Sequence, residues 1–443
     1  MTGSRQSLRP DGQPKLALFT AIPAIGHINP LLMQARELHR RGWRVALAST
    51  ERVRGHVERF GEVCFVDLGS DPLGMPAFED LQARVSAETS FLRGTIRIMR
   101  WVNGLWPTMF DGLMVALLHD RPDVVVADLV TIAGLDAAEQ MGIAHVINNA
   151  DLLTAISVEV LPPAPDVPLL FSGHSIHRIG RMDRSLNPFW RRVGATVFNL
   201  TLGVELNRLR RDRGLPPRRF TRRHRGKLVM TNSAFGLEYN RVLPPLLQMV
   251  GPMLEDTPDA LPRELEDWLG QARPVVFVNL GTLARPQPDL VQKVAAGLAS
   301  DAFRVLWVLR EATSLVFPPN VRVEPWVASQ VGVLAHPNVR LFVSHCGINS
   351  AQESLYWGTP VVGIPMLADQ RDMAMRVQDA SVGQMLDKNH FTAHQLRSAI
   401  GTVLNDPAYG RNIPAIQSSF RLAGGARRAA DLIEHAAASG TVR

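Results

Sequence analysis

A histidine lies in a turn between an apolar run at 16–25 and a helical pattern at 31–41. Gly26 permits a tight turn, and Pro30 suits the first position of a helix because its missing N–H costs nothing there. His27 is therefore expected at the carboxyl end of a strand, where open α/β sheets bind ligands. A neutral imidazole near its ordinary pKa accepts a proton from a hydroxyl group at neutral pH. His27 is a candidate general base, with a purely structural turn histidine as the alternative.

A histidine that acts as a base needs a carboxylate on its second ring nitrogen, which fixes the tautomer and stabilises the imidazolium as it forms. Asp128 follows the β-branched run 124–127 and is also predicted at the exit of a strand. We expect Asp128 to be this partner. An aspartate that caps the N-terminus of a helix is an equally good interpretation of the local sequence.

A second group of polar residues surrounds the turn after the predicted strand 340–344. The turn contains Gly347, and a helix is expected to begin near Asn349. Such a strand, turn and helix directs free backbone N–H groups and the positive end of the helix at a phosphate. His345, Asn349 and Ser350 would add side-chain donors to the same anion.

Carboxylates and amides follow at positions that suit sugar hydroxyls. Glu353 lies one helical turn after Asn349, so it is expected to face the same cavity and accept hydrogen bonds from a ribose. Asp369 and Gln370 follow the next predicted strand and suit the vicinal hydroxyls of a hexose. A separate glycine turn makes Thr282 a weaker candidate for a phosphate contact.

These candidate sites require strands that end at a common edge of a sheet. Short β-branched runs alternate with segments of helical period, which predicts an α/β fold with parallel strands joined by helical crossovers. Strands are expected at 15–21, 44–49, 63–68, 124–127, 145–148 and 227–231, and in a second series at 275–280, 304–309, 321–324, 340–344 and 360–364.

Two Rossmann-like domains are the natural interpretation of two such series. The segment 251–262 holds three prolines and three acidic residues with little apolar periodicity, as an interdomain linker does. The expected division is a first domain over 1–250, this linker, and a second domain over 263–443. Apolar residues at helical spacing within 425–438 predict an amphipathic helix that closes back at the end of the chain.

Composition places the chain among soluble globular proteins. It has 443 residues, of which 46% are hydrophobic and 20% charged. The two cysteines, Cys64 and Cys346, are too few for a disulfide framework, so a cytoplasmic location is expected. The uncharged stretch 193–204 has 12 residues. A span of the bilayer needs roughly 20, so no transmembrane helix is expected.

Positive charge is concentrated in one block. Residues 176–227 contain fifteen Lys or Arg against three acidic residues, whereas the whole chain has a net charge of only +7. The block is expected to be a solvated, arginine-rich helix and loop, with peripheral contact to an anionic membrane as the alternative. No aromatic pattern typical of RNA binding accompanies the charge, so nucleic acid is not an expected partner.

The second group of residues resembles the donor-binding signature of UDP-dependent glycosyltransferases of the GT-B fold, including plant secondary-product enzymes and bacterial macrolide-type enzymes. The resemblance is strongest over 321–370 and weakest over 69–227. In that family the histidine, asparagine and serine hold the diphosphate, the glutamate holds the ribose, the Asp-Gln pair holds the sugar, and an upstream tryptophan stacks on uracil. The resemblance implies these roles for His345, Asn349, Ser350, Glu353, Asp369, Gln370 and Trp326, and the expected donor site also includes Thr282, Gln330 and Gly347.

Some residues depart from the family pattern. Trp326 stands ten residues before His336, one more than the signature has, and Ala328-Ser329 replaces the usual proline. The uracil platform is therefore expected to be shifted. Ile348 stands where plant enzymes carry tryptophan, which removes one aromatic wall near the sugar. Gln370 is similar to the glucose-preferring version of the signature.

The catalytic histidine of the family and its aspartate match His27 and Asp128 in position. The resemblance implies an inverting, metal-independent transfer of a hexose, with glucose favoured, from a UDP-sugar to a hydroxyl of a small hydrophobic acceptor. No Asp-x-Asp pair occurs in the sequence, so no metal site is expected, and the UDP-sugar is a co-substrate with no further cofactor. The residues expected to line the acceptor pocket are Phe91, Met99, Trp101, Trp106, Met109 and Phe110. The alternative is that these side chains pack in the protein core.

Several other functions compete with this one. A nicotinamide oxidoreductase needs Gly-x-Gly-x-x-Gly after a strand, and the sequence has no such run. A transferase of deoxysugars from a TDP donor shares the fold and the base, although His345 lacks a second histidine beside it. A membrane-lipid or sterol glycosyltransferase would use the basic block 176–227. A non-enzymatic sugar-nucleotide sensor would keep the donor site but would not need His27 and Asp128.

Overall fold

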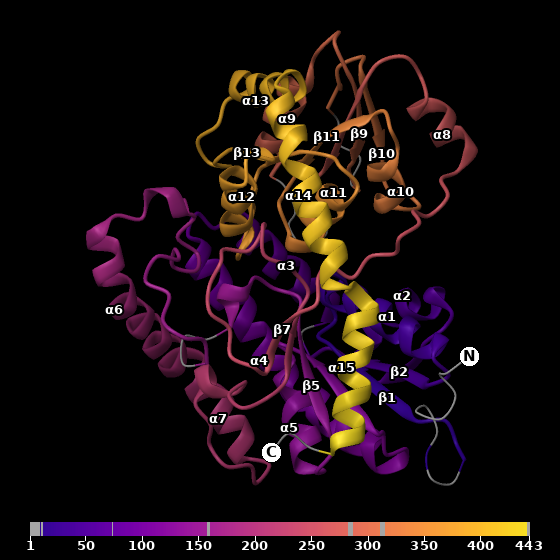
Figure 1. Ribbon diagram of the computed structural model, residues 1–443, viewed down its shortest axis with the longest axis vertical. Helices are drawn as coiled ribbons and strands as arrows, with labels where there is room; N and C mark the ends of the chain where they lie inside the picture. Colours follow the sequence, from indigo (N-terminus) through magenta and orange to yellow (C-terminus); the bar gives the residue numbers. More distant parts are fainter. Residues whose placement is uncertain are drawn as a thin grey trace.

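The computed structural model describes residue 9 and residues 12–72, 74–156, 160–281, 287–310 and 315–440. Within these ranges the chain forms two parallel β-sheets, one in each half of the sequence. Figure 1 shows the two sheets one above the other, each with helices packed around it. The predicted α/β architecture of two Rossmann-like units is confirmed.

The first sheet has its strands in the order β3-β2-β1-β4-β5-β6-β7. The chain extends one side of the sheet from β1 to β3 and then crosses back to place β4 beside β1. This reversal creates the switch point at which doubly wound sheets bind ligands. The strands are β1 (Leu16–Thr20), β2 (Arg44–Ser49), β3 (Cys64–Asp67), β4 (Val124–Asp128), β5 (His145–Asn149), β6 (Val229–Thr231) and β7 (Leu247–Met249).

The second sheet repeats this arrangement in the order β10-β9-β8-β11-β12-β13, with its switch point between β8 and β11. A register shift between β8 and β11 lies near the start of the pair, away from the carboxyl ends. The strands are β8 (Val275–Asn279), β9 (Arg304–Val308), β10 (Val321–Glu324), β11 (Val339–Ser344), β12 (Val361–Gly363) and β13 (Gly383–Met385).

Both sheets are covered on two faces, which explains why their central strands are continuous apolar runs rather than alternating ones. β4 is buried at every residue, and β8 at all but its last. Every strand of the two predicted series is present, with ends that differ by at most two residues. The pattern does not predict β7 and β13, because three residues at the edge of a sheet are too few to show a period.

Helices connect the strands and cover the sheets. In the first half they are α1 (Ile25–Arg40), α2 (Arg54–Phe60), α3 (Gly74–Ala87), α4 (Phe91–His119), α5 (Ile132–Gln140), α6 (Arg181–Phe198) and α7 (Val204–Arg211). In the second half they are α8 (Arg263–Leu269), α9 (Pro288–Leu298), α10 (Gln330–Ala335), α11 (Ile348–Tyr356), α12 (Gln370–Asp379), α13 (Ala393–Asn405), α14 (Pro407–Ala423) and α15 (Gly425–Ser439).

The start of α1 differs from the prediction. The helix begins at Ile25 with Ala24 as its N-cap, so His27 lies in its first turn and Pro30 lies inside the helix. The predicted position of Pro30 at the start of a helix is therefore wrong. A proline has no N–H to donate to the carbonyl four residues before it. The carbonyl of Gly26 is left without its helical partner and is free to accept from another donor.

The last helix returns to the first half of the chain. Figure 1 shows α14 and α15 as two successive yellow helices that run from the upper sheet to the lower one. α15 contacts α1, β4 and β5, and its residues Ala429, Ala430, Ile433 and Ala436 are buried in the core of the first sheet. The predicted closing helix is thus present, and it ties the end of the chain to the first sheet.

The predicted linker lies between β7 and α8. Residues 250–262 contain no helix or strand, and α8 begins at Arg263. The domain limits at 250 and 263 stay predictions. Within the described residues, none of the helices combines the length and the apolar character needed to span a bilayer.

Candidate active site

A cleft of about 2090 Å³ separates the two halves of the molecule. Its walls include the segments that follow β1, β4, β5, β8, β11 and β12, so it lies where the carboxyl ends of both sheets face each other. Parts of α3, α4 and α6 complete the wall of the first half. The predicted site residues that line the cleft are His27, Trp326, Gln330, His345, Gly347, Asn349, Ser350, Glu353, Asp369 and Gln370. Thr282 lies outside the described residues.

The predicted histidine and aspartate form a pair. His27 Nδ1 lies 2.9 Å from Asp128 Oδ1. The Asp128 side chain is fully buried, whereas 21% of the His27 side chain is exposed. With Nδ1 bonded to the carboxylate, Nε2 is the ring nitrogen left for a ligand in the cleft.

The topology of the first sheet brings this pair together. β1 and β4 are neighbours at the switch point, so the turn after β1 and the end of β4 meet although they are 101 residues apart. The second oxygen of Asp128 accepts hydrogen bonds from Val130 N at 3.2 Å and Thr131 Oγ1 at 3.1 Å. Thr131 Oγ1 in turn accepts from Ile22 N at 2.8 Å. The carboxylate is therefore held in one orientation, as a histidine-orienting group requires.

The pKa of His27 is higher than expected from the sequence. Burial acts to lower it, but the charge and hydrogen bond of Asp128, with contributions from Asp151 and Asp369, raise the pKa to about 9. The expectation of an ordinary imidazole pKa is therefore wrong. The physical reason is that three carboxylates stabilise the imidazolium more than burial destabilises it.

Asp151 and Arg223 also belong to the site, although neither is part of a sequence motif. Both line the cleft and are close enough to Asp128 to interact with it electrostatically. Burial lowers the pKa of Arg223 to about 9 despite the nearby carboxylates. Asp151 follows the end of β5, so the strand-exit rule that singles out Asp128 would also have indicated it. Arg223 lies in a loop and carries no such signal.

The turn after β11 has the form of an anion-binding turn. Cys346 adopts a left-handed backbone conformation with φ 56°, and its N–H donates to Ser344 Oγ at 3.1 Å. α11 then begins at Ile348, one residue before its predicted start, and its N-cap Gly347 provides no side-chain cap. The first N–H groups of α11 are therefore available to an anion in the cleft.

Two glycines make room for His345. A Cβ at Gly347 would lie 2.5 Å from His345 Nε2, and one at Gly281 would lie 2.8 Å from the same atom. Gly281 also has φ +90°, which disfavours any side chain. Burial lowers the pKa of His345 to about 4, so its ring is neutral and donates from only one nitrogen. Its buried Nδ1 has no hydrogen-bond partner among the described residues.

Gln330 forms hydrogen bonds with three polar side chains in the wall of the cleft. Its Nε2 donates to Glu353 Oε2 at 2.6 Å and to Ser350 Oγ at 3.1 Å. Its Oε1 accepts from Asn279 Nδ2 at 2.7 Å. Burial raises the pKa of Glu353, and the hydrogen bond from Gln330 opposes that shift. Gln330 therefore orients the carboxylate that is predicted to bind ribose.

Asp369 and Gln370 lie at the start of α12, but only part of Gln370 is free. Gln370 Oε1 accepts from the N–H groups of Met366 at 2.9 Å and Leu367 at 3.0 Å. Only its amide nitrogen is left for a sugar hydroxyl. Asp369 Oδ2 is buried without a hydrogen-bond partner among the described groups. Burial, with the charges of Asp151 and Asp372, raises the pKa of Asp369 to about 7.

Trp326 lies in the wall of the cleft and is 67% exposed. It follows β10, and the next helix, α10, is capped by Ser329, whose Oγ accepts from Gly332 N at 2.9 Å. Ser329 Oγ also donates to Asp259 Oδ2 in the linker segment at 2.8 Å. The serine that replaces the family's proline thus has a local structural role.

The predicted acceptor pocket is correct for only some of its residues. Met99 and Trp101 line the cleft. Trp106, Met109 and Phe110 are instead buried in the core between α4 and the sheet, and do not line it. Their interpretation as pocket residues is wrong, because α4 turns that face toward the sheet. Phe91 does not line the cleft either. The apolar wall also includes residues that the sequence does not indicate, which are Phe78, Leu92, Ile98, Trp190 and Phe198.

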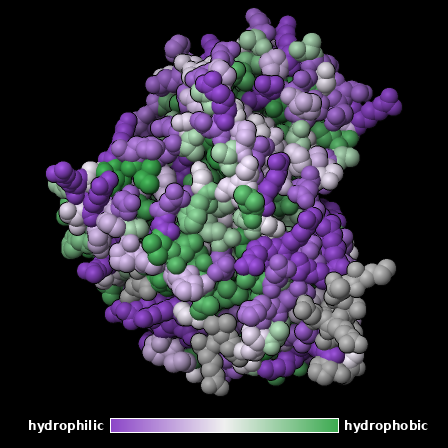
Figure 2. Space-filling model, viewed as in Figure 1, coloured by the Kyte–Doolittle hydropathy of each residue, from purple (hydrophilic) through white to green (hydrophobic). Residues whose placement is uncertain are grey.

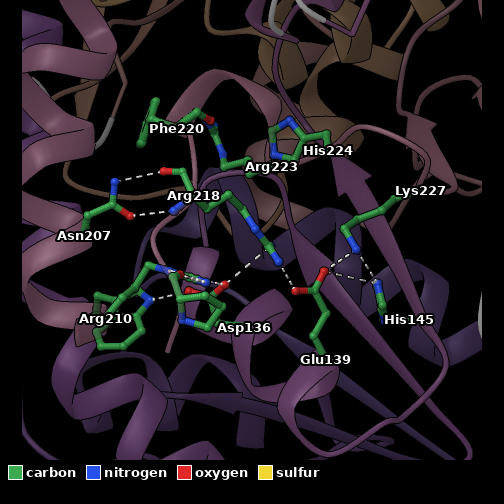
Figure 3. A network of polar contacts seen from close by, with 12 residues as sticks. Asp136, Glu139, His145, Asn207, Arg210, Arg218, Phe220, Arg223, His224 and Lys227 are labelled. Atoms are coloured by element: carbon green, nitrogen blue, oxygen red, sulfur yellow. Dashed lines mark hydrogen bonds and ion pairs between the residues drawn. The ribbon is translucent and has the colours of Figure 1, made fainter. Parts of the chain in front are cut away.

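Part of the basic block 176–227 is a buried network rather than a solvated surface (Figure 3). Arg210 pairs with Asp136, whose side chain is fully buried, and Arg218 and Lys227 both pair with Glu139. Trp106 Nε1 also donates to Asp136 Oδ2 at 3.0 Å. These contacts attach α7 and the segment after it to α5, and the predicted solvated helix and loop is wrong for this part of the block.

Within the described residues, no three His, Cys, Asp or Glu side chains are grouped in a way that could hold a metal ion. The independence from metal implied by the resemblance stays a prediction, and so do the roles assigned to the residues of the cleft. The geometry brings the His27–Asp128 pair from the first half of the chain and the N-terminus of α11 from the second half to one cleft.

Comparison with known proteins agrees with this geometry. The chain matches the family model "UDP-glucoronosyl and UDP-glucosyl transferase" over residues 111–421. It is 28% identical over 370 residues to UDP-glycosyltransferase 1 of Phaeomoniella chlamydospora, covering 77% of this chain and 74% of that protein. It is 26% identical over 304 residues to the 2-hydroxyacylsphingosine 1-beta-galactosyltransferase of Rattus norvegicus, covering 68% of this chain and 56% of that protein.

Solved structures show the same fold. The glycotransferase of kitacinnamycin superposes with a TM-score of 0.69 at 22% identity, covering 96% of this chain and 99% of that chain. The calicheamicin glycosyltransferase CalG4 superposes with a TM-score of 0.68 at 21% identity, covering 95% and 98%. The chain belongs to the UDP-glucoronosyl and UDP-glucosyl transferase family and is a glycosyltransferase that uses a UDP-sugar.

Proposed function

We propose that the chain transfers a hexose, with glucose as the favoured sugar, from a UDP-sugar to a hydroxyl of a small hydrophobic acceptor. The observation that carries the proposal is the His27–Asp128 pair at 2.9 Å, in the same cleft as the N-terminus of α11. A nucleotide sugar bound with its diphosphate at α11 would present its anomeric carbon toward that pair. The acceptor would lie against the apolar wall formed by α3, α4 and α6.

The proposed reaction is a single in-line displacement with inversion. The neutral form of His27 takes the proton of the acceptor hydroxyl through Nε2, and the oxygen attacks the anomeric carbon on the face opposite UDP. Asp128 stabilises the imidazolium that forms. The C–O bond to the diphosphate breaks, and UDP leaves with the electron pair.

The charge that develops on the leaving diphosphate would be stabilised by the first N–H groups of α11, with Asn349, Ser350 and neutral His345 as side-chain donors. One preorganised donor of this kind contributes about 3 kcal/mol to the transition state. This arrangement would supply the stabilisation without a metal ion. Glu353, oriented by Gln330, would bind the ribose hydroxyls, and Asp369 with the Gln370 amide nitrogen would bind the hexose.

The test is an assay with UDP-glucose, UDP-galactose and TDP-glucose against phenolic, macrolide, sterol and sphingoid acceptors, with and without EDTA, beside His27→Ala. We expect acceptor-dependent release of UDP that survives EDTA and is lost in the variant. The anomeric coupling constant of the product, measured by NMR, reports inversion or retention. Turnover that persists in His27→Ala, or a retained configuration, would reject the proposed mechanism.

Two observations favour other acceptors or donors as second candidates. The rat relative is named for transfer to 2-hydroxyacylsphingosine, so an amphipathic lipid is the second acceptor class to test. A natural-product glycosyltransferase that uses a TDP-deoxysugar is the second donor candidate. The glycosyltransferase VinC, solved in complex with DTDP, has the same fold with a TM-score of 0.66 at 18% identity.

A further inference from the structure

α6 carries an apolar stripe on the face that points away from the core. Exposed apolar side chains recur three or four residues apart from Met182 to Phe189 on α6. They recur again from Val197 through the π-helical turn η4 (Asn199–Gly203) to Val204 at the start of α7. Single exposed hydrophobic residues are ordinary, but a row of them on one helical face indicates an interaction surface. The exposed fractions are 71% for Met182, 44% for Leu186, 56% for Phe189, 39% for Val197, 67% for Leu200 and 57% for Val204.

The same helix also forms part of the active-site cleft. Gly194, Ala195 and Phe198 line the cleft from the opposite side of α6. Trp190 both lines the cleft and is 50% exposed, so it lies at the border between the two faces. Asn187 is the only buried residue of α6. Figure 2 shows hydrophobic side chains interleaved with hydrophilic ones over this helix, at the left of the molecule.

Arginines border the stripe along one edge and at both ends. By helical spacing Arg181 and Arg192 lie along the same edge, with Asp183 on the other, while Arg178 precedes the stripe and Arg208 and Arg211 follow it. All five arginines are exposed, and none forms an ion pair with an acidic residue in the described part of the chain. They differ in this respect from the paired arginines of the buried network in Figure 3. The surface therefore presents apolar side chains together with uncompensated positive charge.

We propose that α6, η4 and α7 form a docking surface for an anionic lipid bilayer. A helix with an apolar face and flanking arginines lies in the headgroup region, where the apolar side chains leave water and the arginines meet lipid phosphates. A second copy of this chain fits the surface less well, because a two-fold contact would bring the same arginines against each other. The bilayer matches both the apolar stripe and the sign of the charge.

Docking in this way would set the acceptor wall of the cleft at the membrane surface. α6 has the bilayer on one side and the cleft on the other, with Trp190 between them. A hydrophobic molecule dissolved in the leaflet that faces the protein would then enter the cleft beside α6 and reach His27 within it. The docking itself does not depend on which sugar or acceptor the enzyme uses.

The test is flotation of the full chain with vesicles of phosphatidylcholine, with or without phosphatidylglycerol. We expect the protein to float with the anionic vesicles and to be released at high salt, since exposed charges are screened within about 10 Å at 0.1 M salt. Equal flotation with both kinds of vesicle would reject the role of the arginines. No flotation with either would overturn the proposal.

The double variant Leu186→Glu with Phe189→Glu alters the proposed docking surface without altering the cleft, because neither residue lines the cleft. Its matched control is Leu118→Glu with Leu422→Glu, at positions that are 70% and 87% exposed on α4 and α14. We expect the α6 variant to lower the bound fraction about tenfold or more and the control to leave it unchanged. Both should bind UDP as the unmodified chain does, which shows that the fold is intact.

Sedimentation of the same proteins without lipid tests whether a second copy of the chain, rather than a bilayer, covers the stripe. If the unmodified chain is a dimer that the α6 variant converts to a monomer, the stripe is an interface between copies, and the membrane proposal is overturned. A monomer in both cases, with flotation lost only in the α6 variant, supports it.

Discussion

The side-chain amide of Asn349 donates to the main-chain carbonyl of Gly26 at 2.8 Å, and this hydrogen bond joins the two halves of the chain across the cleft. Gly26 is adjacent to His27, and Asn349 is in the first turn of α11. The carbonyl is free because Pro30, four residues later in α1, has no N–H to give it. The proline within the helix therefore makes possible a contact between the turn that carries the base and the helix proposed to bind the diphosphate.

This contact predicts the effect of changing Asn349. Asn349→Ala removes a donor proposed to serve both Gly26 and the diphosphate, and a hydrogen bond to a charged group is worth about 1.5–3 kcal/mol. We expect kcat/KM to fall about tenfold to a hundredfold. Pro30→Ala should return a helical donor to the Gly26 carbonyl, raise the thermal stability of the protein and still lower turnover. Unchanged turnover in both variants would mean that the contact has no role in catalysis.

The pKa of His27 predicts an alkaline pH profile. A base must be neutral to accept a proton, and carboxylates stabilise the protonated form of His27 up to about pH 9. The turnover rate should therefore rise from pH 7 to pH 9 on the order of fifty-fold. Because the pKa of the folded state lies above that of the unfolded chain, the stabilisation linked to this proton is full below pH 6.5 and is lost as the pH rises through 9.

Asp128→Asn tests the origin of that profile. The variant keeps the shape of the side chain but removes its charge, so the midpoint of the pH profile should move to lower pH. The maximal rate should fall by about a hundredfold to ten-thousandfold, because the tautomer and the imidazolium are no longer stabilised. Stopped assays between pH 5 and 10 would measure both effects, and a midpoint that does not move would disprove the assigned cause of the shift.

Gly347→Ala should weaken donor binding through His345. The new Cβ would lie 2.5 Å from His345 Nε2, so the ring must move away from the anion-binding turn. We expect the affinity for UDP, measured by calorimetry, to fall about tenfold or more. Gly104→Ala in α4 is the control, because a Cβ there meets nothing within 4 Å. Equal affinity in the two variants would contradict the role assigned to His345.

Gln330 is predicted to act by positioning Glu353. Gln330→Ala removes its hydrogen bonds to Glu353 and Ser350 and leaves the carboxylate without a fixed orientation. Gln330→Glu would place a second carboxylate against Glu353 and should weaken UDP binding further than the alanine change. The expected effect is on KM for the UDP-sugar more than on kcat. A loss confined to kcat would argue against this position in the ribose site.

The buried network predicts a large effect on stability at Asp136. Asp136→Ala would leave Arg210 buried without its charge partner, and removing one partner of a buried pair costs about 3–5 kcal/mol. Asp111→Ala, which breaks the more exposed pair with Arg213, should cost about 1 kcal/mol or less. Denaturant unfolding of both variants measures the difference. Similar values would show that the network in Figure 3 adds little to stability.

The sequence alone determined the α/β class, the strands of the two sheets and the polar residues at their exits. These features are local: a buried strand between helices on both faces must be a short, continuous apolar run, and a strand-turn-helix that binds an anion needs glycine at the turn. That is why the sequence predicts His345, Asn349 and Glu353 around one cavity, and all three line the cleft.

The tertiary structure alone decided which distant groups meet. Asp128 and Asp151 follow similar strands, yet only Asp128 reaches His27 Nδ1, because β4 and not β5 pairs with β1. Packing between segments far apart in the chain decides three further features in the same way. It buries Trp106 in the core, raises the pKa of His27 and brings the Asn349 amide to the Gly26 carbonyl. A periodic pattern reports that a residue is buried, whereas its partners are set by the order of the strands and the angle of each helix.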